Sequence, residues 1–531
     1  MLGHSSSSDA ARLERDAIQV FEMHSPRDPP SRADSTNLEK DEDSKDVAET
    51  GVRDVPDAAA AAAAHLDGLE LTPEEDRRIL RKIDWNILPL LSLVYLIQFI
   101  DKTALSFASI MGLREDTHIS LSQYSWLSSI FYIAFLVGEW PTNYLLQRLP
   151  LGKYTGANII LWGVVLACTA ATSNFAGLMV VRFLLGLFES CVTPSFALVT
   201  SQWYRKREQG ARTAVWFSCN SLAVVLGAIL AWGFARHDAA GDFSIPGWKI
   251  LFIFLGGITI VLGIAVLLFL PDSPLTAHFL NERERALAIE RIRTNQTGIG
   301  ARVHKWYQVK EALVDPLTWC YCLYAVALNI FNGGVTAFFG IIIASFGFSK
   351  LDALLYNAPG GGLLFVGVLF FLWIGDRLRM RIASGMVALS IGLLGVLLCW
   401  QLPTHLKVGR LMGYYLWLYA TIGLIVIVSL LSSNVAGSTK KTTVTAMFFI
   451  SYAVGNLIGP QTFRSADAPR YGPGLATSAA VIAFGILDLG VIWFLCAREN
   501  RRRDGLETTH KPNQEFQDLT DRENLEFRYT C

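Results

Sequence analysis

Repeated apolar runs constrain this chain more than any other feature of its sequence. An α-helix needs about 20 apolar residues to cross the hydrocarbon core of a bilayer. Runs of about that length recur at residues 87–110, 124–146, 156–173, 177–200, 213–235, 249–270, 317–344, 354–374, 382–400, 411–433, 442–463 and 475–497. Only 17% of the residues are charged, whereas a soluble globular chain carries about 25%. The sequence therefore predicts an all-α membrane protein with about 12 transmembrane helices.

The runs form two sets of six, which predicts two six-helix bundles joined by a polar linker. We expect five parts: a disordered cytosolic N-terminal tail (1–70), a first bundle (71–271), a cytosolic linker (272–315), a second bundle (316–497) and a cytosolic C-terminal tail (498–531). The N-terminal tail is polar and has too little apolar surface to form a core. Thr72-Pro73-Glu74-Glu75 predicts a helix start, because it combines a capping box with proline at the first helical position. A charged helical segment is expected at 281–293 in the linker.

Lys and Arg residues are concentrated in alternate loops. The loop after the fourth run holds Arg205, Lys206, Arg207 and Arg212, whereas the loop after the first run holds only Arg114. Because Lys and Arg collect in cytoplasmic loops, both termini are predicted to be cytosolic. We expect a multi-pass protein of the plasma membrane.

Arg182 and Glu189 lie inside the fourth apolar run. Their spacing of seven residues is nearly two helical turns, which places them on one face and roughly 10 Å apart along the axis. Ionised groups at that depth cost several kcal/mol in hydrocarbon, so they are expected to face a protein interior or a wet cavity. Two interpretations remain open: a static pair that locks neighbouring helices, or a substrate or proton site of a transporter.

The first run contains Asp101 and Lys102 in an otherwise apolar segment. Counting residues from the outer ends of the helices places Asp101 roughly 14 Å deep, between Arg182 at roughly 8 Å and Glu189 at roughly 18 Å. If the two helices are adjacent, Asp101 is able to pair with Arg182 when ionised and to release it when protonated. Asp101 and Glu189 are the candidate proton-coupling residues, and Lys102 and Arg182 are candidates for binding an anion. The alternative for Asp101 and Lys102 is a pair near the outer headgroups, with Lys102 extended toward the surface.

Polar residues in the seventh and eleventh runs are further candidates for substrate binding. These residues are Asn329, Tyr452, Asn456 and Gln461. Gly455, Gly459 and Pro460 permit a helix break there, which would let the polar groups reach a ligand. Interhelical hydrogen bonding with close small-residue packing is the alternative. Asp488 in the twelfth run has no evident partner in its own helix.

Several classes of function are disfavoured by composition and motifs. Lys plus Arg and Asp plus Glu both number 46, which argues against nucleic-acid binding because that needs a basic excess. The eight cysteines lack CxxC pairs and histidines at metal spacing, so neither a metal site nor a disulfide framework is expected. No nucleophile–base pair or phosphate-binding loop is evident, so we do not expect an enzyme. We expect no cofactor, with a proton gradient as the energy source.

Several motifs together resemble the major facilitator superfamily, specifically its anion:cation symporter branch and the fungal allantoate permease group. The matching segments cover much of the chain between roughly residues 75 and 500, and they are 101–103, 123–130, 132, 141–154, 182–189, 203–204, 270–274, 437–441 and 455–461. In bacterial sugar-acid members of this branch, an Asp-Arg pair in the first span and an Arg/Glu pair in the fourth handle proton and carboxylate. Asp101, Arg182 and Glu189 occupy the matching positions. Lys102 replaces the arginine, and lysine is a point charge rather than a planar fork.

The resemblance implies a proton-driven importer that alternates a central site between the two membrane faces. The predicted function is uptake of a small organic anion, such as allantoate or another ureide, a carboxylate, a dipeptide or a vitamin-like compound. The expected partners are this substrate, protons and the lipid bilayer, and the chain is expected to function as a monomer. An exporter of a secondary metabolite is the alternative, since fold does not decide the direction of flux. A nutrient sensor that signals through its tails is a third interpretation.

Overall fold

The computed structural model describes residues 72–146, 148–293, 305–378, 380–506 and 519–531. Within these residues the chain forms α-helices and short 3₁₀ turns and no strand. The predicted disordered tail, residues 1–70, lies outside them.

Each predicted apolar run coincides with one helix or with two consecutive helices. The first half contains α3 (Pro73–Ile110), α4 (Leu113–Asp116), α5 (Leu121–Leu146), α6 (Leu151–Cys168), η1 (Thr169–Ala171), α7 (Phe175–Glu189), α8 (Val192–Trp203), α9 (Lys206–Ala239) and α10 (Gly247–Phe269). Between the halves lie η2 (Pro274–Thr276), α11 (Glu282–Arg293) and α12 (Trp306–Val314). The second half contains α13 (Pro316–Ser345), α14 (Lys350–Leu355), α15 (Asn357–Leu378), α16 (Arg381–Gln401), α17 (Lys407–Trp417), α18 (Ala420–Asn434), α19 (Ser438–Ile458), η3 (Gly459–Thr462), η4 (Ser465–Asp467) and α20 (Gly472–Asp504).

Eleven helical stretches of the described chain are long and apolar enough to cross a membrane. The remaining predicted span is α5, which has 26 residues and so is long enough, but it carries several polar side chains such as Gln123, Asn143 and Glu139. It packs against α7 of its own half and against α19 of the other half. The all-α membrane fold is therefore confirmed.

The predicted start of the first helix is confirmed. Thr72 Oγ1 accepts a 3.3 Å hydrogen bond from the backbone N–H of Glu75, and the Glu75 carboxylate accepts one of 3.4 Å from the N–H of Thr72. This capping box satisfies backbone groups that the first helical turn leaves unpaired. The predicted helix at 281–293 is α11.

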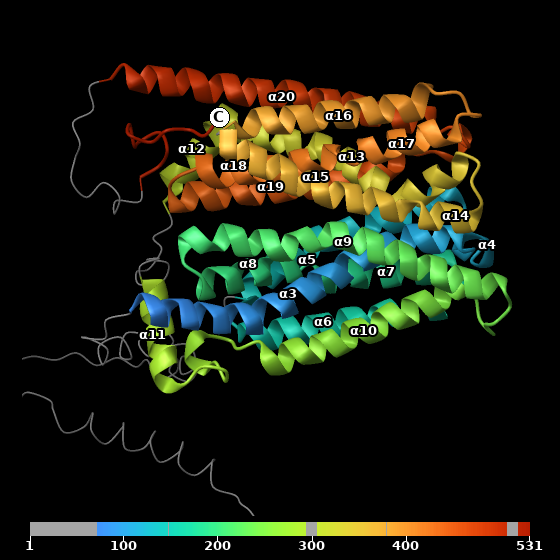
Figure 1. Cartoon of the computed structure of the whole chain (residues 1–531), viewed down its shortest axis with the longest axis horizontal. Coiled ribbons are helices and arrows are strands. Elements are labelled where there is room, and N and C mark those ends of the chain that lie inside the picture. The colour runs from blue at the N-terminus through green and yellow to red at the C-terminus, as the bar shows by residue number, and fades with distance from the viewer. Residues whose placement is uncertain (1–71, 147, 294–304, 379, 507–518) are drawn as a thin grey trace, which may run out of the picture. The chain divides into compact units, whose positions relative to one another are not determined.

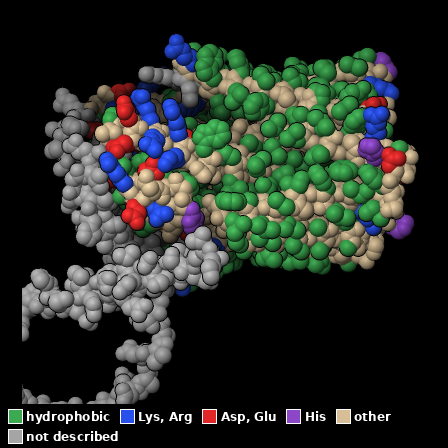
Figure 2. Space-filling model, turned by 60° about the horizontal axis from the view of Figure 1, so that its bottom comes forward, with side chains coloured by type: hydrophobic (Ala, Val, Ile, Leu, Met, Phe, Trp, Pro, Cys, Tyr) green, Lys and Arg blue, Asp and Glu red, His purple; other side chains and the backbone are tan. Residues whose placement is uncertain are grey.

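The helices form two bundles, one from each half of the chain (Figure 1). Close pairs include α6 with α10 and α3 with α9 in the first bundle, and α13 with α19 in the second. Helix α13 lies deepest, because 72% of its apolar window is buried against 33 to 50% for the other candidate spans. On the face shown in Figure 2, apolar side chains cover the middle and charged ones gather at the ends.

Several hydrogen bonds between described residues of the two bundles lie in one half of the molecule. We call the end where α3 begins and α20 ends the terminal end, and the opposite one the far end. Near the far end, the Tyr124 hydroxyl donates to the Ala337 carbonyl at 2.7 Å, and the Gly340 N–H donates to Ser106 Oγ at 3.2 Å. Ser129 Oγ also donates to the Leu457 carbonyl at 2.8 Å. In this structure the bundles are thus joined on the far-end side.

Candidate functional site

Asp101 and Lys102 are consecutive residues of α3 but turn to different partners. Successive side chains of an α-helix point about 100° apart. Asp101 is 1% exposed, and its Oδ2 accepts a 2.7 Å hydrogen bond from Nε1 of the buried Trp162 on α6. Its Oδ1 has no hydrogen-bond partner among the described residues. Arg182 is within electrostatic range of Asp101, and the two residues line the same cavity.

Lys102 forms an ion pair with Glu189 of α7. The Lys102 Nζ and Glu189 Oε1 atoms are 3.0 Å apart, and the two side chains are 19% and 0% exposed. The contact is mainly electrostatic, because neither Glu189 oxygen has a hydrogen-bond partner of good geometry among the described residues. The sequence analysis placed Arg182 and Glu189 on one face of a single helix and did not pair Glu189 with Lys102. The ion pair of Glu189 forms across two helices.

Arg182 is buried, with 3% of its surface exposed. Its Nε and Nη2 have no hydrogen-bond partner in the described part of the chain. Its guanidinium carbon lies 5.7 Å from the centre of the Phe252 ring, and Asp101 and Tyr124 are within electrostatic range. A buried guanidinium with unused donors is costly unless a further acceptor binds there.

Three of these charged residues line a small cavity between the bundles, and Glu189 is not among its lining residues. Asp101, Lys102 and Arg182 contribute from the first bundle, and Gly333, Thr336 and Ala337 of α13 contribute from the second. The cavity volume is about 30 Å³, which is room for water rather than for an organic molecule. Binding a larger ligand therefore requires the bundles to move apart.

Tyrosines surround Lys102. Tyr95, Tyr132 and Tyr452 lie within electrostatic range of its ammonium group, and Tyr132 also lines the cavity. Of the residues predicted from the eleventh run, Tyr452 is thus the one near the central charges. A phenol offers both a donor and an acceptor, so this group suits a ligand with polar edges.

The other predicted binding residues mainly join helices. Asn456 donates to Asn329 Oδ1 at 3.0 Å, and Asn332 donates to Asn456 Oδ1 at 3.0 Å. Gln461 Nε2 donates to Ser129 Oγ at 2.9 Å, across the two bundles. Asn329 and Asn456 are fully buried and do not line the cavity, which favours the interhelical interpretation for them. The predicted break is present, since α19 passes into the 3₁₀ turn η3 at Gly459.

The structure adds Trp162 to the site and places Asp488 away from it. Trp162 lies in an apolar run without charges, and only its indole N–H hinted that it needed an acceptor. Asp488 of α20 is 7% exposed and lies near Cys320 of α13 and Tyr324 of the same helix. It is not among the cavity residues.

Two six-helix bundles around a buried group of charges define the chain as a multi-pass membrane transporter. Residues 91–460 match the family model of the Major Facilitator Superfamily. The chain belongs to this family.

Curated relatives match almost the whole chain. A protein of Schizosaccharomyces pombe described as an uncharacterized transporter is 41% identical over 496 residues, which is 92% of this chain and 96% of the relative. The allantoate permease of Saccharomyces cerevisiae is 37% identical over 90% of this chain and 91% of its own length. A thiamine pathway transporter of the same yeast is 34% identical over 91% of each chain. This chain is therefore a transporter and not an enzyme.

A solved structure supports the same fold. A bacterial homologue of the human lysosomal transporter Spinster, in an inward-facing and occupied conformation, aligns with a TM-score of 0.59 over 78% of this chain and 96% of that chain. The two sequences are 16% identical, so this similarity concerns the fold alone.

Proposed function

We propose that this transporter carries a small organic anion into the cytosol together with protons. The main observation behind the proposal is that the buried guanidinium of Arg182 lies beside the central cavity with two nitrogens, Nε and Nη2, that have no hydrogen-bond partner among the described residues. A planar guanidinium matches a carboxylate through two parallel hydrogen bonds. A cationic ligand would instead be repelled at this position.

The proposed coupling to protons is based on the ion pair between Lys102 and Glu189. While Glu189 is ionised, its carboxylate neutralises Lys102 across 3.0 Å. A proton on the Glu189 carboxyl removes that counter-charge and leaves Lys102 to interact with an anion. The anion then replaces the lost negative charge, so proton and substrate favour each other's binding. Asp101, held by Trp162 beside Arg182, is the second acid in this scheme.

The substrate class is proposed from charge and from the relatives. Allantoate is the first candidate because the relative named allantoate permease is 37% identical over most of both chains. An uptake screen in yeast cells that express the chain should compare allantoate, ureidosuccinate, dipeptides, vitamins and simple carboxylates. We expect accumulation of at least one anion, and uptake restricted to cations would overturn the proposal.

The proton-coupling residue is tested with Glu189→Gln. We expect this variant to lose uphill accumulation but to keep exchange of substrate across the membrane, because glutamine is permanently neutral. Accumulation driven by a pH gradient in the variant would show that Glu189 is not the coupling acid.

The anion-binding residue is tested with Arg182→Lys. Lysine keeps the positive charge but lacks the planar guanidinium that forms two parallel hydrogen bonds with a carboxylate. We therefore expect uptake to fall at least tenfold at equal amounts of protein in the membrane. Arg236→Lys, at the end of α9 and away from the cavity residues, is the matched control and should leave uptake unchanged.

Orientation and direction are part of the proposal. Basic side chains at the terminal end, among them Lys82, Arg205 and Arg212, support a cytosolic location of that end. The plasma membrane is the membrane that we propose. Labelling of cysteines placed at either end in intact cells tests this orientation. Preloaded cells test the direction of flux, because efflux without uptake would favour an exporter of a metabolite.

A further inference from the structure

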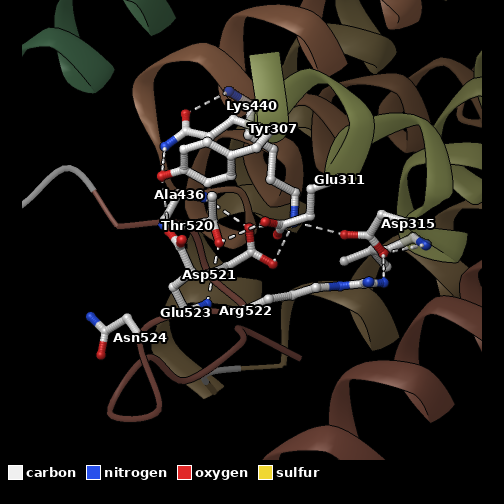
Figure 3. Close-up of polar contacts among 12 residues, drawn as sticks. Tyr307, Glu311, Asp315, Ala436, Lys440, Thr520, Asp521, Arg522, Glu523 and Asn524 are labelled. Atoms are coloured by element: carbon white, nitrogen blue, oxygen red, sulfur yellow. Dashed lines mark hydrogen bonds and ion pairs between the residues drawn. The ribbon is translucent and has the colours of Figure 1, made fainter. Parts of the chain in front are cut away.

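Residues 519–531 pack against the terminal end of the second bundle, and Figure 3 shows polar contacts made by Thr520, Asp521, Arg522 and Glu523. The side chains of two asparagines each accept one hydrogen bond from the main chain of this segment and donate one to it. Asn434 of α18 accepts from the Thr530 N–H at 2.7 Å and donates to the Thr530 carbonyl at 3.0 Å. Asn500 of α20 does the same with Tyr529, with both hydrogen bonds at 2.9 Å. We call residues 519–531 the docked segment.

A buried lysine lies at the centre of this contact. Lys440, in the first turn of α19, is 1% exposed. Its Nζ lies 2.8 Å from Asp315 at the start of α13, 3.0 Å from Glu311 of α12 and 2.8 Å from Asp521 of the docked segment. A buried ammonium group needs counter-charges. The docked segment supplies one of them from a distant part of the sequence.

A second cation holds the middle of the docked segment. Arg503 of α20 is 1% exposed and donates to the carbonyl oxygens of Asn524 and Phe527 at 3.2 and 2.8 Å. Its guanidinium lies 4.9 Å from the centre of the Tyr529 ring. The Tyr529 hydroxyl in turn donates to Asp521 at 2.7 Å. The segment is thus held at several points by charge-assisted contacts.

The first bundle has a corresponding arrangement with a different element. Arg291 of α11 lies 2.8 Å from Asp76 of α3 and 2.6 Å from Glu208 at the start of α9. Arg205, in the turn between α8 and α9, also pairs with Asp76 at 3.0 Å. In the first bundle, Arg291 therefore bridges Asp76 at the start of the first helix and Glu208 at the start of the fifth. In the second bundle, Lys440 at the start of the fifth helix pairs directly with Asp315 at the start of the first.

The ionic arrangements of the two bundles differ in the element that completes each of them. In the first bundle, the linker helix α11 supplies the cation. In the second, the docked segment supplies an acid and has no helix of its own among its described residues. Its contacts are mostly ionic and polar, and its Leu525 side chain is 44% exposed, although Tyr529 and Cys531 pack, partly buried, against the apolar core. A segment that buries few apolar side chains opens at a lower free-energy cost than a packed helix.

We propose that the terminal end of the second bundle is a peptide-binding site, occupied by the docked segment, which acts as a releasable clamp on the turn between α18 and α19. In a transporter whose bundles alternate between states, this turn lies at the end that must close when the far end opens. Release of the segment loosens the turn and changes how readily the terminal end closes. This proposal assumes that the chain is a transporter of this family, but it does not depend on the proposed substrate or on proton coupling.

Hydrogen exchange of the full-length protein tests the clamp. Asp521→Asn removes the charge that pairs with Lys440, and we expect amide exchange at 434–441 to become at least fivefold faster. Exchange at 203–208, the corresponding turn of the first bundle, is the internal control and should not change. Leu525→Ala, at an exposed position of the same segment, is the matched control variant. Unchanged exchange at 434–441 in Asp521→Asn would overturn the proposal.

A synthetic peptide of residues 519–531 provides the second measurement. Added to the full-length Asp521→Asn variant, it should bind saturably and should restore protection at 434–441. A peptide with the Asp521→Asn change should bind at least tenfold more weakly. The absence of binding by the unmodified peptide to this full-length variant would contradict the proposal. None of these measurements uses a transport substrate, so they fail independently of the proposed function.

Discussion

At the scale of single residues, the central charges divide into two neighbouring groups. Trp162 and Arg182 surround Asp101, while Glu189 holds Lys102. A buried ion pair contributes little net stability when complete, but removal of one partner leaves an uncompensated charge and costs about 3 to 5 kcal/mol. The Lys102–Glu189 pair is therefore open to test by stability as well as by transport.

Lys102→Gln alone should destabilise the protein strongly, because it leaves Glu189 buried without its cation. The double variant Lys102→Gln/Glu189→Gln should recover most of the lost thermal stability, since neither charge then remains. We expect neither variant to accumulate substrate. Melting temperatures in detergent, with Glu189→Gln as the third member of the cycle, measure the coupling. Additive effects of the two substitutions would mean that the residues do not interact.

At the scale of helices, close packing and end contacts position the site. Helices α6 and α10 approach closely through Gly163 and Gly256, which places Trp162 of α6 in the core beside Asp101. At the terminal end, α11 is attached to α3 through charged side chains. Lys82 Nζ lies 2.6 Å from Glu284, and Arg291 binds Asp76.

Gly256→Ala and its neighbour Gly257→Ala should differ sharply. A Cβ atom at 256 would lie 2.7 Å from the backbone N of Ala167 and from the carbonyl oxygen of Gly163, whereas one at 257 has no atom within 4 Å. We expect Gly256→Ala to destabilise the protein by about 1 to 3 kcal/mol through overpacking. Gly257→Ala should be neutral or slightly stabilising, because alanine favours the helix. Thermal unfolding of the two variants in the same detergent decides this.

Glu284→Gln should lower stability in a pH-dependent way. Burial opposes ionisation of this carboxyl, but hydrogen bonds from Lys82 and from the Asn281 N–H outweigh burial and lower the pKa of Glu284. A lowered folded-state pKa means that the stabilisation is present above the unfolded value of about 4.3 and is lost as the pH falls through the folded value. Melting curves should therefore separate wild type from Glu284→Gln at pH 7 by about 1 to 3 °C and converge at acid pH. The exposed Glu282→Gln serves as control, and a gap that persists at acid pH would rule out this linkage.

At the scale of the whole molecule, contacts between the bundles define the state of the transporter. Tyr124, Ser106 and Ser129 of the first bundle bond to α13 and α19 on the far-end side. Alternating access requires these contacts to break when the far end opens. The small central cavity indicates that substrate entry also needs such movement.

A disulfide between Ser106→Cys and Gly340→Cys should lock this state. A Cβ atom at 340 would lie 3.3 Å from Ser106 Oγ, and its close neighbour Ile110 contributes the flexible end of its side chain. Mild oxidation should abolish transport and reduction should restore it, because the far end is then held closed. Cleavage at a protease site inserted within residues 294–304 shows whether the disulfide has formed, because only the disulfide then connects the two halves of the chain covalently. Each single-cysteine variant should transport normally after oxidation, and normal transport by the cross-linked protein would exclude opening at the far end.

By itself, the sequence determined the class of protein and the order and approximate bounds of its helices, because the length and polarity of an apolar run are local properties of the chain. It also identified Asp101, Lys102, Arg182 and Glu189 as a group, since ionised residues in a membrane helix need a polar environment. Only the tertiary structure decided that Glu189 pairs with Lys102, that Trp162 holds Asp101, and that Asn329 and Asn456 bind each other. It alone brought Asp521 onto Lys440. These pairings depend on how helices distant in sequence are rotated and aligned against one another, which no single run of residues specifies.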